Sequence, residues 1–110
     1  MEELVRGDVI VVPFPFSDLS SSKKRPALVV ATTHGDDVIL CQITSQARAD
    51  EHSITLSDSD FKTGQLNQRS TIRPGRIFTA DTSIIIYKIG SLKESKIKEV
   101  ENRIVALFSH

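Results

Sequence analysis

Arg25 stands at a point in the sequence where a guanidinium could bind a phosphate. It follows Lys23 and Lys24 and precedes Pro26 and the apolar run 27–30. The guanidinium is always charged, and its planar fork can bind two phosphate oxygens at once. Pro26 biases Arg25 toward extended backbone, which would hold the arginine at the mouth of a strand. The alternative is a solvated arginine that ends a basic run.

Two further positions offer a hydroxyl and more positive charge. Thr44 ends an apolar run, and its hydroxyl could donate to a phosphate oxygen, although threonine is common at strand ends for structural reasons alone. Alternate residues of a strand point the same way, so Arg69, Thr71 and Arg73 are expected to share a face and form a positive strip. Arg76 would reinforce this strip if a turn brings it round.

The sequence does not identify the groups that would transfer protons in such chemistry. Arginine is a poor base, because its pKa lies above about 12 and it stays protonated. His34, His52 and His110 could titrate near neutrality, but we expect them in a turn, in a loop and at the terminus. The sequence also lacks motifs for NTP, NAD or zinc binding.

Charge and composition limit the class of protein. The 110 residues are expected to form one domain, 1–110, and their 39% hydrophobic and 25% charged content is ordinary for a globular protein. Lys plus Arg and Asp plus Glu number 14 each, so any nucleic-acid site has to be a local patch. With no signal-peptide core or bilayer-length apolar run, a cytoplasmic protein without membrane contact is expected. The single Cys41 excludes an internal disulfide and is expected to be buried.

Short strands are the elements that must position these residues. They are predicted at 5–12, 27–32, 38–44, 53–57, 70–73 and 84–89. We expect the first to end at Pro13, the last to end at Gly90, a Pro- and Ser-rich loop over 13–24, and a hairpin turn at Gly35-Asp36. The strands 53–57 and 70–73 are predicted to pair. Long helical crossovers between strands are missing from the pattern, which favours a small barrel over a parallel sheet.

The last twenty residues change to a helical period. Ser91 and Glu94 have the spacing of a capping box. Apolar residues then recur at three- and four-residue steps, at Ile97, Val100, Ile104 and Leu107. This pattern predicts an amphipathic helix of about four turns that lies across the sheet and closes the core.

Four segments, taken in order and spacing, resemble the MazF/PemK family of bacterial toxins. They are the Gly-Asp strand in 6–14, the Arg-Pro with its apolar strand in 24–30, the Thr-Ser at the end of 43–45, and the late strand and turn in 72–81. Together with the predicted helix they cover nearly the whole chain. The family's fold is a small SH3-like β-barrel of five to seven strands with a C-terminal α-helix, which agrees with the mainly β pattern predicted above.

The resemblance implies a metal-independent, sequence-preferring endoribonuclease without a cofactor, an mRNA interferase. Such enzymes cleave single-stranded RNA by attack of a 2′-hydroxyl on the adjacent phosphate, which leaves a cyclic phosphate and a free 5′-hydroxyl. The resemblance places Arg25, Thr44 and Arg73 in the catalytic set. The expected substrate-binding residues are Asp18, Lys23, Lys24, Ser45, Gln46, Arg69 and Arg76. It also implies neutralisation by a cognate antitoxin and assembly as a homodimer, with the loop 13–24 as a lid over the RNA.

Two departures from the family pattern keep other functions open. Many members carry an aspartate two residues after the arginine equivalent to Arg73, where this chain has Gly75, and the loop 13–24 lacks the histidine that some members use. One alternative is a toxin of the same fold that poisons gyrase through its terminal helix, since fold does not settle function. The other is an inactive relative that only binds RNA or an antitoxin.

Overall fold

The computed structural model of the chain describes residues 3–14, 23–45 and 50–109. Seven strands form one sheet in the order β4-β6-β3-β2-β1-β7-β5. In chain order the elements are β1 (Asp8–Phe14), β2 (Lys23–Thr32), β3 (Asp37–Thr44), β4 (Ile54–Leu56), the 3-10 helix η1 (Asp58–Asp60), β5 (Phe61–Thr63), β6 (Ser70–Asp81), the 3-10 helix η2 (Thr82–Ile84), β7 (Tyr87–Leu92) and the helix α1 (Glu94–Leu107).

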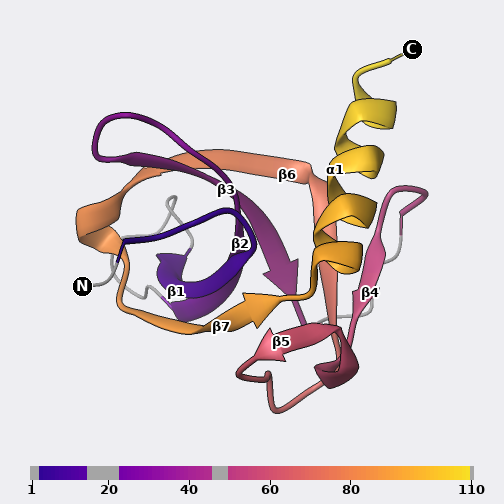
Figure 1. Cartoon of the computed structure of the whole chain (residues 1–110), viewed down its shortest axis with the longest axis horizontal. Coiled ribbons are helices and arrows are strands. Elements are labelled where there is room, and N and C mark those ends of the chain that lie inside the picture. Colours follow the sequence, from indigo (N-terminus) through magenta and orange to yellow (C-terminus); the bar gives the residue numbers. More distant parts are fainter. Residues whose placement is uncertain (1–2, 15–22, 46–49, 110) are drawn as a thin grey trace.

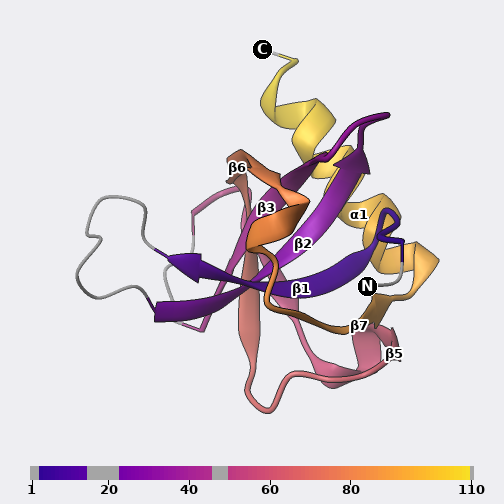
Figure 2. The ribbon, with the colours of Figure 1, turned by 90° about the vertical axis from the view of Figure 1, so that its left-hand side faces the viewer.

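The sheet curls, so that β6 and β7 lie on opposite sides of it and α1 stands beside β6 (Figure 1). The paired strands run antiparallel throughout. Figure 2 shows β1, β2 and β3 as neighbours in the middle of the sheet. The predicted mainly β fold with a C-terminal helix is therefore confirmed, as a half-barrel of seven strands.

Apolar residues on both faces of the central strands are buried, because each face packs on a core of its own. On β1, Val9 belongs to the core under α1, which also contains Ile97 and Val100. The next residue, Ile10, belongs to the second core, together with Leu40 of β3. Alternation along the strand sends neighbouring residues to opposite faces. The two cores hold β1, β2 and β3 rigidly, and these strands carry the residues discussed below.

The helix closes the core as its period predicts, but it begins later than the capping box indicates. Ile97 and Val100 are buried, and Lys93, without a side-chain hydrogen bond, is the N-cap. Ser91 lies in β7, where its hydroxyl donates to Asp8, so the predicted cap is wrong. Arg6 pairs with Glu94 and Glu101 and ties the helix to the start of β1. In the part of the chain that the structure describes, no helix has the length and apolar character needed to span a membrane.

A carboxylate with 0% exposed surface, that of Asp8, ties β1 to β7. One oxygen accepts a hydrogen bond from the Ser91 hydroxyl at 2.9 Å and faces the Lys88 ammonium at 3.2 Å. The other accepts from the backbone N–H of Val5 at 2.9 Å. A buried charge is tolerated only when it is paired and hydrogen-bonded in this way. The Gly-Asp segment that opens the chain thus fixes the position of β7.

Several strand boundaries differ from the predicted ones for local reasons. The first strand begins at Asp8 and continues through Pro13, which pairs opposite Lys24, so a proline did not end it. Lys23 and Lys24 are strand residues rather than part of the loop 13–24, and residues 15–22 of that loop lie outside the described ranges. The last strand starts after η2, where the Asp81 side chain accepts from the N–H of Ser83.

Other pairings agree with the sequence. Residues 27–32 and 38–44 lie in β2 and β3, and β4 pairs with the start of β6, with Ile54 opposite Ile72. Cys41 is buried, and its thiol donates to the carbonyl of Arg73 at 3.0 Å. Burial raises the pKa of the Cys41 thiol to about 12.

Gly90 does not end the last strand as predicted, since β7 continues to Leu92. The glycine is needed there because β5 lies too close to its backbone for any side chain. A Cβ at Gly90 would lie 2.1 Å from the carbonyl oxygen of Thr63. Gly64 faces the same contact from the other side with φ +76°, a backbone conformation that favours glycine. The glycines therefore allow β5 to pair with β7.

We expect Gly90→Ala to lower the free energy of unfolding by about 1–3 kcal/mol, since the clash is with backbone that cannot move without breaking the β5–β7 pairing. Urea denaturation followed by circular dichroism measures this loss. Gly35→Ala is the matched control, because a Cβ there meets no atom within 4 Å, and we expect a change of at most about 0.5 kcal/mol. Equal losses in the two variants would contradict the close approach.

Candidate functional site

A groove of about 500 Å³ crosses the sheet where β2 begins and β3 ends. Its walls come from five neighbouring strands, β6, β3, β2, β1 and β7, and from the segment between β5 and β6. The lining residues are Val11, Lys23, Lys24, Arg25, Pro26, Ile43, Thr44, Ser45, Leu66, Asn67, Gln68, Ser70, Tyr87 and Ile89. We call it the β2–β3 groove.

The antiparallel pairing of β2 and β3 brings Arg25 and Thr44 to the same groove. Ala27 pairs with Gln42, and two residues beyond this pair both Arg25 and Thr44 line the β2–β3 groove. Arg25 is half-buried, whereas Thr44 is 6% exposed at the end of its strand. Arg25 and Thr44, which come from separate strands, therefore line one groove.

The β2–β3 groove is positively charged although the chain as a whole is neutral. Lys23, Lys24 and Arg25 line it in succession, and none of its described lining residues is acidic. Among the residues that the structure describes, no carboxylate lies within ion-pair distance of Arg25. Within the described residues, the charge of the arginine is therefore not paired with a carboxylate, and the three cations form a local basic patch.

Arg73 lies on β6, where it pairs with Gln42 of β3, and it does not line the β2–β3 groove. Its side chain is 18% exposed, its Nη2 lies 3.5 Å from a carboxylate oxygen of Asp50, and its buried Nε has no hydrogen-bond partner among the described residues. Thr71 and Arg73 are both half-buried between buried neighbours, so they share a face as predicted. Hydrogen bonds from His52 N–H and the Ser53 hydroxyl, with Arg73, lower the pKa of the Asp50 carboxyl.

The remaining arginines do not join Arg25. Arg69 precedes β6 and lines a separate hollow of about 350 Å³, which shares residues 66–68 with the β2–β3 groove. Arg76 is exposed in the bulge of β6, between Arg73, which pairs with Gln42, and Ile77, which pairs with Cys41. Arg76 does not line the β2–β3 groove, so the predicted turn toward the other arginines is wrong. Gly75 lies in the same bulge and is exposed, with open space where a Cβ would be.

The other predicted positions lie partly in the groove and partly outside the described residues. Ser45 lines the β2–β3 groove, while Asp18 and Gln46 lie outside the described residues, as does His110. His34 is exposed in the β2–β3 turn, and His52 lies 3.5 Å from the Glu51 carboxylate. Neither histidine lines the groove.

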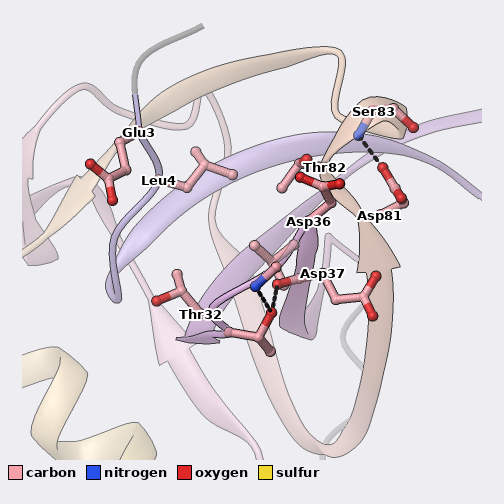
Figure 3. A pocket seen from close by; sticks show the side chains of 11 residues that line it. Glu3, Leu4, Thr32, Asp36, Asp37, Asp81, Thr82 and Ser83 are labelled. Atoms are coloured by element: carbon pink, nitrogen blue, oxygen red, sulfur yellow. Dashed lines mark hydrogen bonds between the residues drawn. The ribbon is translucent and has the colours of Figure 1, made fainter.

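A larger hollow, of about 620 Å³, lies at the other end of β2 and β3 and has the opposite charge. Figure 3 shows the carboxylates of Glu3, Asp36, Asp37 and Asp81 around it. The Asp81 carboxylate accepts from Ser83 N–H at 2.8 Å, which lowers its pKa. Four negative side chains would repel a phosphate, so this hollow does not suit a nucleic acid.

Sequence reasoning missed several residues of the groove wall. Tyr87 and Ile89 come from β7, Val11 comes from β1, and 66–68 come from the segment before β6. In the sequence they look like ordinary strand or loop residues. The β1–β2 pairing places Val11 opposite Pro26, and the β1–β7 pairing places Tyr87 opposite Val11. The one available signal was that Tyr87 is the single tyrosine of the chain.

Several solved structures have the same fold. An "endoribonuclease in complex with its cognate antitoxin" from a mycobacterial species superposes with a TM-score of 0.72 at 18% identity, covering 94% of this chain and 93% of that one. The Mycobacterium tuberculosis toxin MazF-mt6 gives 0.69 at 22% identity, covering 94% and 96%. MazF from Deinococcus radiodurans gives 0.76 at 16% identity, covering 100% of both chains. At such identities the likeness establishes the fold.

The sequence itself identifies the family. Residues 5–108 match the family described as PemK-like, MazF-like toxin of type II toxin-antitoxin system. No curated protein matches the chain. The match spans every strand and the helix, from Val5 before β1 to the end of α1, and agrees with the shared fold. The chain therefore belongs to the PemK-like, MazF-like family of type II toxin–antitoxin toxins.

Proposed function

We propose that this chain is an endoribonuclease toxin that cleaves single-stranded RNA in the β2–β3 groove, with a preference for sequence and without a metal. The observation that carries the proposal is the convergence of Arg25 and Thr44 on one basic groove without described carboxylates in its wall. Unpaired RNA suits it, because exposed bases can be read and a duplex hides them. The endoribonucleases of the same fold support this assignment.

The reaction requires charge to be stabilised where the 2′-hydroxyl oxygen attacks the neighbouring phosphorus. The 2′-hydroxyl gives up its proton as a P–O bond forms to the 2′-oxygen, and the 5′-oxygen takes up a proton as its bond to phosphorus breaks, which leaves a 2′,3′-cyclic phosphate and a 5′-hydroxyl. The fork of Arg25 binds two nonbridging oxygens as their charge grows. The Thr44 hydroxyl donates to one of the same two nonbridging oxygens. Lys23 and Lys24 bind flanking phosphates as point charges.

The partners follow from the same groove. An antitoxin with an acidic segment would neutralise the toxin by occupying the basic surface around Lys23, Lys24 and Arg25. Antitoxin complexes of structures with this fold, including MazE–MazF of Deinococcus radiodurans, support such a partner. We also propose a homodimer, with the RNA path running across the two-fold interface.

Metal-free digestion with mapping of the product ends tests the proposed reaction. The purified protein is incubated with mixed-sequence single-stranded RNA in EDTA. We expect 5′-hydroxyl and cyclic-phosphate ends at recurring short sequences, because cationic side chains rather than a metal ion stabilise the charge on the phosphate. Ends that appear only when magnesium is added, or ends that carry 5′-phosphates, would contradict it.

We expect Gly75→Asp to change the cleavage rate by less than about threefold, because Gly75 lies on the exposed bulge of β6 and does not line the β2–β3 groove. A Cβ at this position meets open space, so the variant is expected to fold. The measurement is the single-turnover rate on one mapped RNA site, with Gly75→Ala as control for loss of the glycine. A gain of a hundredfold or more would instead identify a decayed enzyme.

The end of α1 favours a second candidate, a toxin that acts by binding a protein such as gyrase. Val105 and Phe108 are 63% and 76% exposed, and exposed apolar side chains that lie close together are typical of protein-binding surfaces. The same digestion separates the two functions. RNA that stays full-length, together with inhibition of gyrase supercoiling that Phe108→Ala relieves, would favour this candidate.

A further inference from the structure

We infer that Tyr87 is a stacking platform for one RNA base next to the phosphate bound at Arg25. The inference rests on the proposed function and adds to it a residue that positions a nucleotide. Tyr87 lines the β2–β3 groove and is nevertheless 52% exposed. A large aromatic side chain that leaves half its surface in water adds little to the core, so its place in the groove calls for a ligand with an apolar face.

The strand register places Tyr87 at the distance that such a role needs. Val11 pairs with Pro26 on one side and with Tyr87 on the other, so these three side chains form one row across β2, β1 and β7. Neighbouring strands lie about 4.8 Å apart, so Tyr87 is about 10 Å from Pro26 and from the arginine beside it. A phosphate at Arg25 would then leave the base of an adjoining nucleotide over the ring.

The floor of the row is apolar, whereas its rim is polar. Val11 and Ile89 lie beside Tyr87, and Asn67 and Gln68 border the same groove from the opposite segment. A base stacks its face on an aromatic ring, and its edge donates to and accepts from amide groups. The groove therefore offers a surface for the base face and hydrogen-bonding groups for its edge.

The backbone under Tyr87 is held in place. The neighbouring Lys88 pairs with the buried Asp8, and the N–H of Ile86 donates to the carbonyl of Val11 at 2.8 Å. A ring on a fixed strand loses little conformational freedom when a base stacks on it. Ile86, 41% exposed, does not line the groove, which makes it a matched control.

The chain contains one tyrosine and no tryptophan, so its tyrosine emission reports on Tyr87 alone. The probe is a 2′-O-methyl oligonucleotide that spans a mapped cut and cannot be cleaved, labelled with fluorescein for anisotropy. We expect its binding to quench the tyrosine emission. Tyr87→Leu is expected to raise the Kd roughly ten- to hundredfold, Tyr87→Phe to stay near the wild type, and Ile86→Ala to change it less than twofold.

Oligonucleotides with an abasic residue at each position in turn show which base stacks. At one position the abasic probe should bind the wild type as weakly as the intact probe binds Tyr87→Leu, and the two changes together should add no further loss. If the wild type binds tightly without quenching of the tyrosine emission, and Tyr87→Leu has the same Kd, this inference is overturned while the proposed nuclease function is not. If the tyrosine emission changes with protein concentration but not with added RNA, a second copy of the chain covers Tyr87, and the inference is also overturned. If the wild type neither binds nor cleaves RNA, the proposed function is overturned as well.

Discussion

Replacement of Arg25 by alanine is expected to reduce single-turnover RNA cleavage by about a hundred- to thousandfold, with folding unchanged. A preorganised donor aimed at developing negative charge contributes a factor of this size in comparable sites. The side chain is half-buried on the wall of the β2–β3 groove, and no described carboxylate pairs with it, so its loss leaves no buried partner uncompensated. The rate is measured on a synthetic RNA that contains one mapped site.

Two variants separate the guanidinium from simple positive charge. Arg25→Lys keeps the charge but loses the planar fork, so we expect it to recover only part of the rate. Lys98→Ala removes one exposed charge from α1, which contributes no residue to the groove wall, and should keep the full rate. An Arg25→Ala protein that retains more than a tenth of the wild-type rate would exclude the catalytic role.

Loss of the buried Asp8 carboxylate is expected to be the most destabilising single change outside the groove. Asp8→Ala should lower the free energy of unfolding by about 3–5 kcal/mol, because it leaves the Lys88 ammonium, the Ser91 hydroxyl and the Val5 N–H without their acceptor. The total free energy of unfolding of a domain of this size is about 5–15 kcal/mol. Urea denaturation followed by circular dichroism gives the value.

Two controls show whether the interaction network of Asp8 is the cause. Asp8→Asn keeps the shape and one acceptor oxygen, so we expect a smaller loss than in Asp8→Ala. Asp58→Ala removes an exposed carboxylate from η1 and should change stability by at most about 0.5 kcal/mol. A loss below 1 kcal/mol in Asp8→Ala would mean that β1 and β7 are joined by their backbone pairing alone.

The parts of the fold that depend on local pattern could be predicted from the sequence. The β-branched runs around Val29 and Leu40 define β2 and β3, and the period of Ile97 and Val100 defines α1, because each pattern records which face is buried. The pairing of Ile54–Leu56 with the strand that begins at Ser70 was predicted for the same reason. The 3-10 helices and β5 were not predicted, because the position of each depends on contacts made elsewhere in the chain.

Features that depend on contacts between distant residues could not be predicted. Ser91 has the type and spacing of a helix cap, yet its hydroxyl donates to Asp8, 83 residues earlier in the chain. Gly90 has the appearance of a strand end, yet it allows the approach of Thr63. A single sequence contains no record of such distant pairs, so a local rule was applied at both places and was wrong.

The candidate site divides in the same way. Arg25 and Thr44 could be placed together because they lie at the ends of two strands joined by a short turn. Arg73 was grouped with them by the family resemblance alone, and it lies outside the groove wall and near Asp50. Tyr87 was missed because β7 reaches the site only through its pairing with β1.

A crystal structure with an uncleavable oligonucleotide would test the central claim most directly. The oligonucleotide carries a 2′-deoxy sugar at the mapped cut, so that the attacking hydroxyl is missing and the phosphate stays intact. We expect the phosphate at the cut to lie within hydrogen-bond distance of both the Arg25 guanidinium and the Thr44 hydroxyl. A phosphate bound elsewhere on the protein, with the β2–β3 groove filled by solvent, would contradict the account.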